Sequence, residues 1–399
     1  MITILNKQQC CGCGACVQKC PRQCITLQPD DKGFFYPVVN KDTCIDCGIC
    51  EKVCPFLTPF DSNTPLKYIG ANCKDDSVRA TSSSGGAFTV FAESIIKSGG
   101  VVFGARFDEH WQIVIDYTET LEGLVAFRGS KYVQASTGKT FSLCESFLKE
   151  GRTVLYTGTP CQISGLNHYL RKSYDNLVTC DFVCHGVPSP KVWDNYLQKI
   201  IREFKCTNKI DSTKSGYDYI KSISFRNKDD GWMHFNLLID LYDPETDTKG
   251  QIKELHKTNS YMKCFLKNLS IRESCSICRS KEGRSKSDIT IADFWSANQY
   301  ASDLFDDKGT SLIILNTEKG INNFNDSMFA YLETDVEKAS VRNPGLKSEV
   351  TLHPAREEFF EKLFNKNVNI DLLSNELLKI TLKDRIRRKL KKYLPFCGK

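Results

Sequence analysis

The sequence predicts two structural units in one chain: a small, cysteine-rich α+β domain and a larger mixed α/β core that follows it. Cysteines recur at matched spacing in two sets before residue 55. Between residues 67 and 204, apolar runs of strand length alternate with segments of helical spacing. Pro59 and Pro65 interrupt regular structure between the two regions, which places a boundary near residue 62.

Both cysteine sets have one spacing and end in a Cys-Pro pair, Cys20-Pro21 and Cys54-Pro55. This is the pattern of bacterial two-cluster ferredoxins, in which the last cysteine of each set ligates the other cluster. We therefore predict a ferredoxin-like 2x4Fe-4S domain at residues 1–62. One cluster would take Cys10, Cys13, Cys16 and Cys54, and the other would take Cys20, Cys44, Cys47 and Cys50.

Zinc and disulfides explain this pattern less well. A zinc site is complete with four ligands, whereas each half here supplies four cysteines and a proline. No apolar signal segment precedes the cysteines, so we expect a cytoplasmic protein with reduced thiols. Cys11 and Cys24 fall outside the spacing and are predicted not to be ligands.

Composition is that of a globular protein: 41% of the 399 residues are hydrophobic and 26% are charged. No apolar run reaches the roughly 18 residues that a membrane span needs. The net charge of +6 comes mostly from residues 383–399, which predict a basic amphipathic helix. We expect this tail to be solvated or to contact a membrane surface peripherally. Without interleaved aromatic residues, it does not indicate a nucleic-acid partner.

The core is predicted element by element from its apolar periodicity and its caps. Expected strands lie at residues 67–73, 101–107, 111–117, 153–157, 177–183, 220–226, 234–242, 288–293 and 311–315. Expected helices lie at residues 87–98, 139–149, 160–171, 189–204 and 260–268. We divide the rest of the chain into residues 63–205, residues 206–340 and a helical tail at 341–399.

A Ser/Gly run, Ser82–Gly86, stands where the helix at 87–98 begins. Backbone N–H groups and hydroxyls at such a helix start favour an anion, such as a phosphate of a nucleotide cofactor. A flexible loop is the simpler interpretation of the same run. No GxGxxG motif follows a strand, so a nicotinamide on a Rossmann site is not expected.

A third metal site is predicted from Cys161, Cys184, Cys275 and Cys278, which stand where the backbone changes direction. Thr159 and Pro160 would cap a helix with Cys161 in its first turn, where the helix dipole lowers a thiol pKa. The CxxC pair Cys275/Cys278 suits zinc or a third 4Fe-4S cluster. We favour a cluster; buried thiols without a metal remain the alternative, and Cys264 rivals Cys161 as the fourth ligand.

Six strings in the core resemble one known family, the beta subunit of coenzyme F420-reducing hydrogenase and its dehydrogenase relatives. They are SSSGG (82–86), GSKYVQAS (129–136), TGTPCQISGL (157–166), FVCHGVPS (182–189), CSIC (275–278) and SDITIADFW (287–295). The resemblance implies a flavin-binding core that holds FAD beside a 4Fe-4S cluster on the four core cysteines. It also implies that the first two strings bind the flavin through Ser83, Ser84, Gly85, Gly86, Gly129, Ser130, Lys131, Tyr132, Gln134 and Ser136.

Taken together, the sequence predicts an FAD- and iron–sulfur-dependent oxidoreductase. A flavin stores the two electrons of a hydride, which the one-electron clusters cannot do alone. Lys131, with Arg106 or Arg128, would stabilise negative charge on the reduced flavin. The resemblance implies hydride exchange with a deazaflavin or another organic substrate, a redox partner protein or ferredoxin, and a surface polysaccharide pathway. The alternative is a non-catalytic electron-transfer subunit that feeds a partner enzyme.

Overall fold

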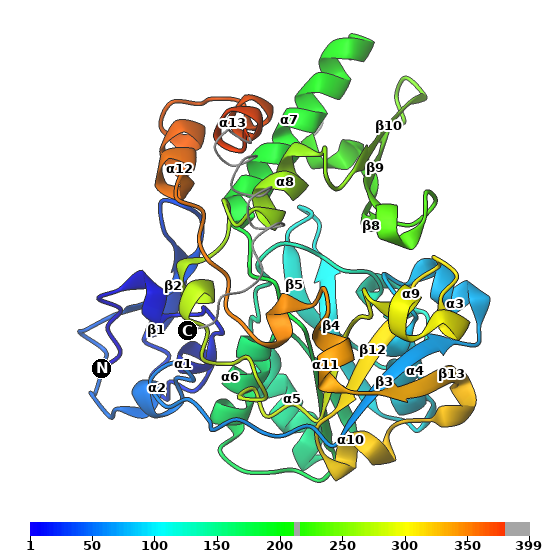
Figure 1. Ribbon diagram of the computed structural model, residues 1–399. Helices are drawn as coiled ribbons and strands as arrows, with labels where there is room; N and C mark the ends of the chain where they lie inside the picture. Colours follow the sequence, from blue (N-terminus) through cyan, green and yellow to red (C-terminus); the bar gives the residue numbers. More distant parts are fainter. Residues whose placement is uncertain (211–215, 380–399) are drawn as a thin grey trace, which may run out of the picture.

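The structure is a computed structural model that describes residues 1–210 and 216–379 (Figure 1). The basic helix predicted at 383–399 lies outside the described residues. Within the described part, no helix has the length and apolar character that crossing a membrane requires.

The N-terminal region has the predicted ferredoxin-like form, two short helices and a hairpin. The helices are α1 (Ala15–Gln18) and α2 (Ile49–Lys52), and the hairpin pairs β1 (Ile25–Pro29) with β2 (Phe35–Val39) antiparallel. Gly14 and Gly48 cap the two helices at φ 81° and 69°, a left-handed conformation that glycine adopts without steric cost. Each helix thereby places one cysteine, Cys16 or Cys50, in the interior of the region.

An eight-stranded mixed sheet forms the centre of the core, with strand order β13-β3-β12-β11-β7-β6-β4-β5. The strands β4, β6, β7 and β11 run parallel, and the remaining neighbours pair antiparallel. Their bounds are β3 (Lys67–Cys73), β4 (Val101–Phe107), β5 (Ile113–Thr118), β6 (Val154–Thr157), β7 (Leu177–Phe182), β11 (Ile289–Asp293), β12 (Ser311–Leu315) and β13 (Phe329–Thr334). The predicted mixed α/β core is confirmed.

Helices cover both faces of this sheet because its strands are apolar on both sides. Helix α4 (Ala87–Lys97) packs on the face that carries Val102, whereas α5 (Thr140–Lys149) and α6 (Pro160–Leu170) pack on the face that carries Val101. The second face also takes up Cys13, Ala15 and Val53 of the N-terminal region. The ferredoxin-like region is therefore docked against α5 and α6, beside the sheet (Figure 1).

A second apolar core forms around the long helix α7 (Pro190–Asn208). It contains the three-stranded sheet β8 (Ile220–Asn227), β9 (Asn236–Asp243) and β10 (Thr248–Leu255), and the helices α8 (Ser260–Leu266), α12 (Arg356–Phe364) and α13 (Ile370–Leu377). Tyr36 from β2 and Phe34, which directly precedes β2, pack into it. Shorter helices are α3 (Asp76–Thr81), α9 (Ala297–Tyr300), α10 (Glu318–Asn322) and α11 (Val336–Ser340), with 3-10 turns that include η5 (Glu273–Ile277).

Candidate metal centres and cofactor cavity

Two cavities in the N-terminal region are each bordered by one predicted set of four cysteines. The first is lined by Cys10, Cys13, Cys16 and Cys54 among other residues. The second is lined by Cys20, Cys44, Cys47 and Cys50. The crossed assignment, in which the last cysteine of each set joins the other three, thus agrees with how the chain folds.

Thiols of the first set act on one another electrostatically. Burial, followed by the neighbouring thiols of Cys10 and Cys54, raises the pKa of Cys16. Burial and the thiol of Cys10 likewise raise the pKa of Cys54. Converging thiols with no carboxylate or imidazole between them form a donor set that suits iron and sulfide.

Sequence reasoning missed that Cys11 and Cys24 also border the two cavities. The Cys24 thiol lies 3.4 Å from that of Cys20, and this contact, then burial and Cys44, raises its pKa to about 11. The Cys11 thiol contacts those of Cys13 and Cys161, so it bridges the N-terminal region and the core. Both residues fall outside the ligand spacing, and no sequence pattern marks them.

The four core cysteines come from three segments of the core: the start of a helix, the end of a strand and a 3-10 turn. Cys161 is in the first turn of α6, whose predicted Thr159 cap accepts from the Gln162 backbone N–H and completes a capping box. Cys184 follows the end of β7. Cys275 lies in η5, and Cys278 is the residue that ends this turn.

These four thiols are close enough to shift one another's pKa. Burial, then Cys275 and Cys161, raises the pKa of Cys184; burial, then Cys278, raises that of Cys275 to about 12. Burial and Cys161 raise the pKa of Cys278. Cys264 instead packs in the core around α7, where burial raises its pKa to about 12 and Lys263 and Asp371 are its charged neighbours. The structure therefore groups Cys161, and not Cys264, with the other three.

One expectation about Cys161 is wrong. The helix start predicts a lowered thiol pKa, but the contact with the Cys11 thiol and then burial raise it well above the ordinary value. A helix dipole contributes at most a few kcal/mol, which burial beside a second thiol exceeds.

The two predicted flavin-binding loops meet at a cavity of about 590 Å³. The Ser130 backbone N–H donates to the Ser83 hydroxyl (2.6 Å), which holds the loops together. Ser83, Gly129, Ser130 and Lys131 line this cavity, together with the rings of Phe107 and Phe225. Polar loop residues and aromatic residues thus both line this cavity.

Cations dominate the cavity wall, which is lined by Arg79, Arg128, Lys131, Arg226, Lys228 and Lys308. Desolvation lowers the pKa of Lys131 to about 7 and that of Lys228 to about 8. The Nε–H groups of Arg128 and Arg226 are buried and have no partner within the described residues. The carboxylates of Asp76, Asp229 and Asp307 also line this cavity, and Arg79, Arg128 and Arg226 each form an ion pair. The two unpartnered Nε–H groups are the donors that an anionic ligand would satisfy.

The other predicted flavin residues lie around this cavity without lining it. Ser84 donates to the Thr310 carbonyl (2.8 Å), and Gly85 approaches the β3 backbone so closely that a Cβ would lie 2.4 Å from the Ala71 oxygen. Gly86 caps α4 at φ 93°. The Tyr132 hydroxyl accepts from Arg226 (3.2 Å), and Ser136 pairs with the β5 backbone.

Two further residues, Gln134 and Arg106, were expected near the flavin but lie away from this cavity. Gln134 lies against the N-terminal region, where its side chain meets Gly12 and accepts from Arg272 (3.3 Å). Arg106, expected near a flavin, pairs with Asp116 across β4 and β5 (2.6 Å) and does not line the cavity.

The segment 129–137 joins the cavity to the cysteines. Lys131 lines the cavity, whereas Thr137 donates its hydroxyl to the Cys13 carbonyl (3.0 Å). Between them, Gln134 touches Gly12 of the first cysteine set. Because consecutive Cα atoms are about 3.8 Å apart, the Cα atoms of Lys131 and Gln134 are separated by at most ~11 Å.

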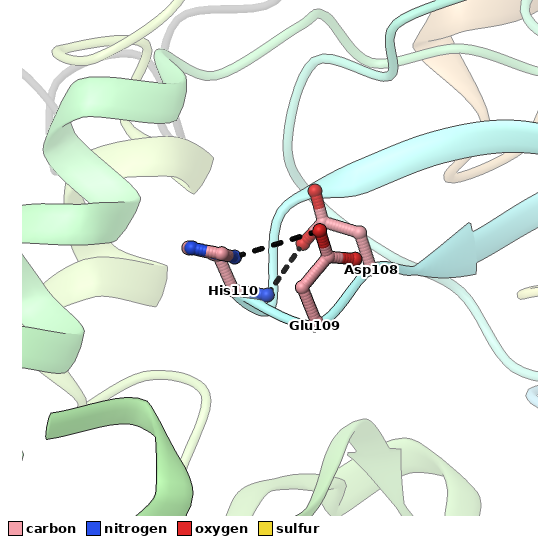
Figure 2. Close-up of side chains that lie close together, drawn as sticks. All are labelled: Asp108, Glu109 and His110. Carbon is pink, nitrogen blue, oxygen red and sulfur yellow. Dashed lines mark hydrogen bonds and ion pairs between the residues drawn. The ribbon is translucent and has the colours of Figure 1, made fainter. Parts of the chain in front are cut away.

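An acidic turn between β4 and β5 brings Asp108, Glu109 and His110 together (Figure 2). The His110 backbone N–H donates to Asp108 (2.9 Å), and its ring lies 3.8 Å from Glu109. Glu109 and His110 are exposed. An exposed acidic turn of this kind is common without a metal, and we assign no site to it.

Comparison with known proteins identifies two segments. Residues 151–339 match the family model for the C terminus of the coenzyme F420 hydrogenase/dehydrogenase beta subunit, and residues 9–57 match that of the 4Fe-4S dicluster domain. Each matched segment is similar to the family whose model it matches. The chain is therefore an iron–sulfur protein related to an oxidoreductase subunit, as the resemblance implied.

The four core cysteines lie inside the segment that matches the beta subunit family, whereas SSSGG and GSKYVQAS precede it. Among solved structures, a chain of the F420-reducing NiFe hydrogenase complex from Methanosarcina barkeri aligns with a TM-score of 0.43 at 15% identity. The alignment covers 79% of this chain and 92% of that chain. No curated protein matches the sequence.

Proposed function

We propose that this chain is an iron–sulfur flavoprotein oxidoreductase that connects a one-electron protein partner to an organic two-electron substrate. The observation that carries the proposal is the segment 129–137, which lines the cationic cavity at one end and contacts the first cysteine set at the other. A site for a two-electron cofactor and sites for one-electron clusters are thereby adjacent in one fold.

The clusters take the ligands that the cysteine geometry favours. Cys10, Cys13, Cys16 and Cys54 hold one 4Fe-4S cluster, and Cys20, Cys44, Cys47 and Cys50 hold the second. Cys161, Cys184, Cys275 and Cys278 hold a third. Four thiol ligands suit a cluster better than they suit a hydrolytic metal site.

FAD fits the cavity of about 590 Å³ by its chemistry. The cations and the unpartnered Nε–H groups of Arg128 and Arg226 suit the pyrophosphate, and Phe107 and Phe225 suit a planar ring. Bound there, FAD would supply the exchange between hydride transfer and single-electron transfer.

The protein contributes positively charged side chains to this site. The Lys131 ammonium, which lines the cavity, donates to the carbonyls of Arg128 and Gly129 (3.0 and 3.2 Å), and these two hydrogen bonds hold it in place. With a pKa near 7, it can carry a proton or release one at neutral pH. Arg226 is fixed by two hydrogen bonds to Asp293 (both 3.0 Å), so it presents its charge without moving.

The exposed residues near the second cluster and the family resemblance indicate which partners this chain would have. Cys47 is exposed, and so is the nearby Ile45, whereas Cys13 is buried against the core and Cys16 is buried within the N-terminal region. A ferredoxin or another one-electron protein would therefore dock at the Cys47 side. The substrate would be a deazaflavin or another organic hydride donor or acceptor, and the surface polysaccharide pathway stays a prediction.

The test is cofactor content combined with a charge variant. Protein purified anaerobically should contain FAD, or take it up, at about one per chain. Arg128→Gln should weaken FAD binding roughly tenfold or more, because a charged hydrogen bond to phosphate contributes about 1.5–3 kcal/mol. Arg152→Gln, which removes an arginine paired with Glu119 away from the cavity, is the matched control and should bind FAD normally.

Absence of flavin from the native protein, with none taken up from solution, would contradict the proposal. The chain would then be an electron carrier for a separate enzyme. Equal FAD affinity in Arg128→Gln and Arg152→Gln would mean that the protein binds FAD at a site other than this cavity.

A further inference from the structure

Arg272 is a fully buried arginine at the junction of the N-terminal region and the core. Its Nε donates to the Cys10 carbonyl (2.8 Å), its Nη2 to the Phe35 carbonyl (2.9 Å) and its Nη1 to Gln134 (3.3 Å). The guanidinium also stacks on Tyr36, 4.2 Å from the ring centroid. It thus stands between the first cysteine set and the core cysteines.

Every one of these hydrogen-bond acceptors is neutral, which sets Arg272 apart from the other buried arginines. Arg79 pairs with Asp306, Arg226 with Asp293, and Arg356 with Glu273 and Glu357. Within residues 1–210 and 216–379, no carboxylate pairs with Arg272. An arginine stays charged even when buried, and a buried charge without a countercharge is strongly unfavourable.

Cysteines surround this charge from both sides. Cys10 and Cys11 approach from the N-terminal region, and Cys275 approaches from the core. Cys161 is also within electrostatic range of the guanidinium. A 4Fe-4S cluster on four thiolates is an anion, and it becomes more negative on reduction. The missing countercharge of Arg272 is therefore supplied when the neighbouring cysteines hold clusters.

We infer that Arg272 is the shared countercharge of the first N-terminal cluster and the core cluster, and that it raises the reduction potential of both. This inference rests on the cluster assignment of the proposed function. One buried positive charge stabilises the added electron on either cluster, because the low local dielectric leaves the interaction largely unscreened. Among the described residues, the thiols that act on Arg272 include none of Cys20, Cys44, Cys47 and Cys50, so the cluster on those four should not respond.

The experiment is a potentiometric titration with dithionite, followed by electron paramagnetic resonance, on anaerobically prepared full-length protein. Iron and sulfide are quantified first for every variant. Arg272→Gln should make reduction of the first N-terminal cluster and of the core cluster less favourable by on the order of tenfold each. It should leave the cluster on Cys20, Cys44, Cys47 and Cys50 unchanged. Arg272→Lys, which keeps the charge, should recover part of the shift.

Arg279→Gln is the matched control. Arg279 also reaches from the core to the N-terminal region, donates to the Phe56 carbonyl (3.0 Å) and stacks on Phe56, but it is exposed. Water screens its charge, so its removal should leave all potentials unchanged. This comparison separates loss of a docking contact from loss of a buried charge.

If the Arg272→Gln protein does not assemble its clusters, the variant Gln134→Glu tests the same inference. The substitution is nearly isosteric and places a carboxylate against the intact Arg272, so it should lower the same two potentials. Full iron content with unchanged potentials in both Arg272→Gln and Gln134→Glu would overturn the inference. A wild-type protein without a core cluster would instead contradict the proposed function, and the potential of the first N-terminal cluster would still report on Arg272.

Discussion

Gly165→Ala tests how the N-terminal region docks on the core. Gly165 lies in α6, one turn after Cys161, and faces Cys13 of the first cysteine set. A Cβ at position 165 would lie 2.9 Å from both the Cβ and the Sγ of Cys13. Atoms of this kind normally stay about 3.5–4.0 Å apart, so one of the two elements has to move.

Two opposing effects set the magnitude. Alanine is better than glycine in a helix interior by roughly 0.5–1 kcal/mol, which by itself would stabilise the protein. Overpacking a buried contact costs about 1–3 kcal/mol, and Cys13 cannot swing away while it ligates a cluster. We therefore expect a net loss of about 1 kcal/mol, together with displacement of Cys13 from its cluster.

The assay measures thermal unfolding and iron content of the anaerobic protein in parallel. Gly165→Ala should lower both the unfolding temperature and the retention of the first cluster. Ser164→Ala is the control, because it adds no atoms and removes a buried hydroxyl that lacks a described partner. A Gly165→Ala protein that is more stable than wild type and keeps full iron would refute the docking of Cys13 on α6.

Two further predictions concern Lys131 and Ile45. Desolvation lowers the pKa of Lys131 from 10.5 to about 7, so the unfolded chain binds one more proton than the folded chain between these values and stability should rise with pH there. In flavin-free protein, the difference in unfolding temperature between wild type and Lys131→Met should shift in favour of wild type from pH 7 to 10; a difference independent of pH would contradict this. Ile45 is 61% exposed beside Cys47, and Ile45→Asp should slow reduction by a protein donor about tenfold in stopped flow without affecting dithionite reduction. The control is Leu372→Asp, exposed on α13, and equal slowing by both variants would place the partner elsewhere.

Much of the core follows from local sequence. The predicted strands at 67–73, 101–107 and 311–315 have the bounds found in the structure, because short apolar runs between turn residues leave little choice. Strands β10 and β13 were missed, since each lies at a sheet edge and has almost no fully buried side chains. Helix α3 was also missed, because only its Val78 and Arg79 are buried and its sequence is that of a polar loop.

The cysteine sets could be predicted because cluster ligation fixes their spacing along the chain. Arg272 and Cys11 could not, since their importance comes from contacts between distant segments. Gln134 is a further residue whose contacts with a distant segment could not be predicted, although it lies within a motif that the sequence analysis singled out. Its string was expected to bind a single ligand, but an extended backbone carries that residue away from Lys131 to the N-terminal region.

The most direct test of the account is the iron content of anaerobically purified full-length protein and its cysteine variants. Three clusters predict about twelve iron atoms per chain, and the double variant Cys275→Ser/Cys278→Ser should retain about eight. Cys264→Ser, which removes a buried cysteine outside the three sets, should keep the wild-type content. An iron content that is the same in wild type and the double variant would contradict a core cluster on Cys161, Cys184, Cys275 and Cys278.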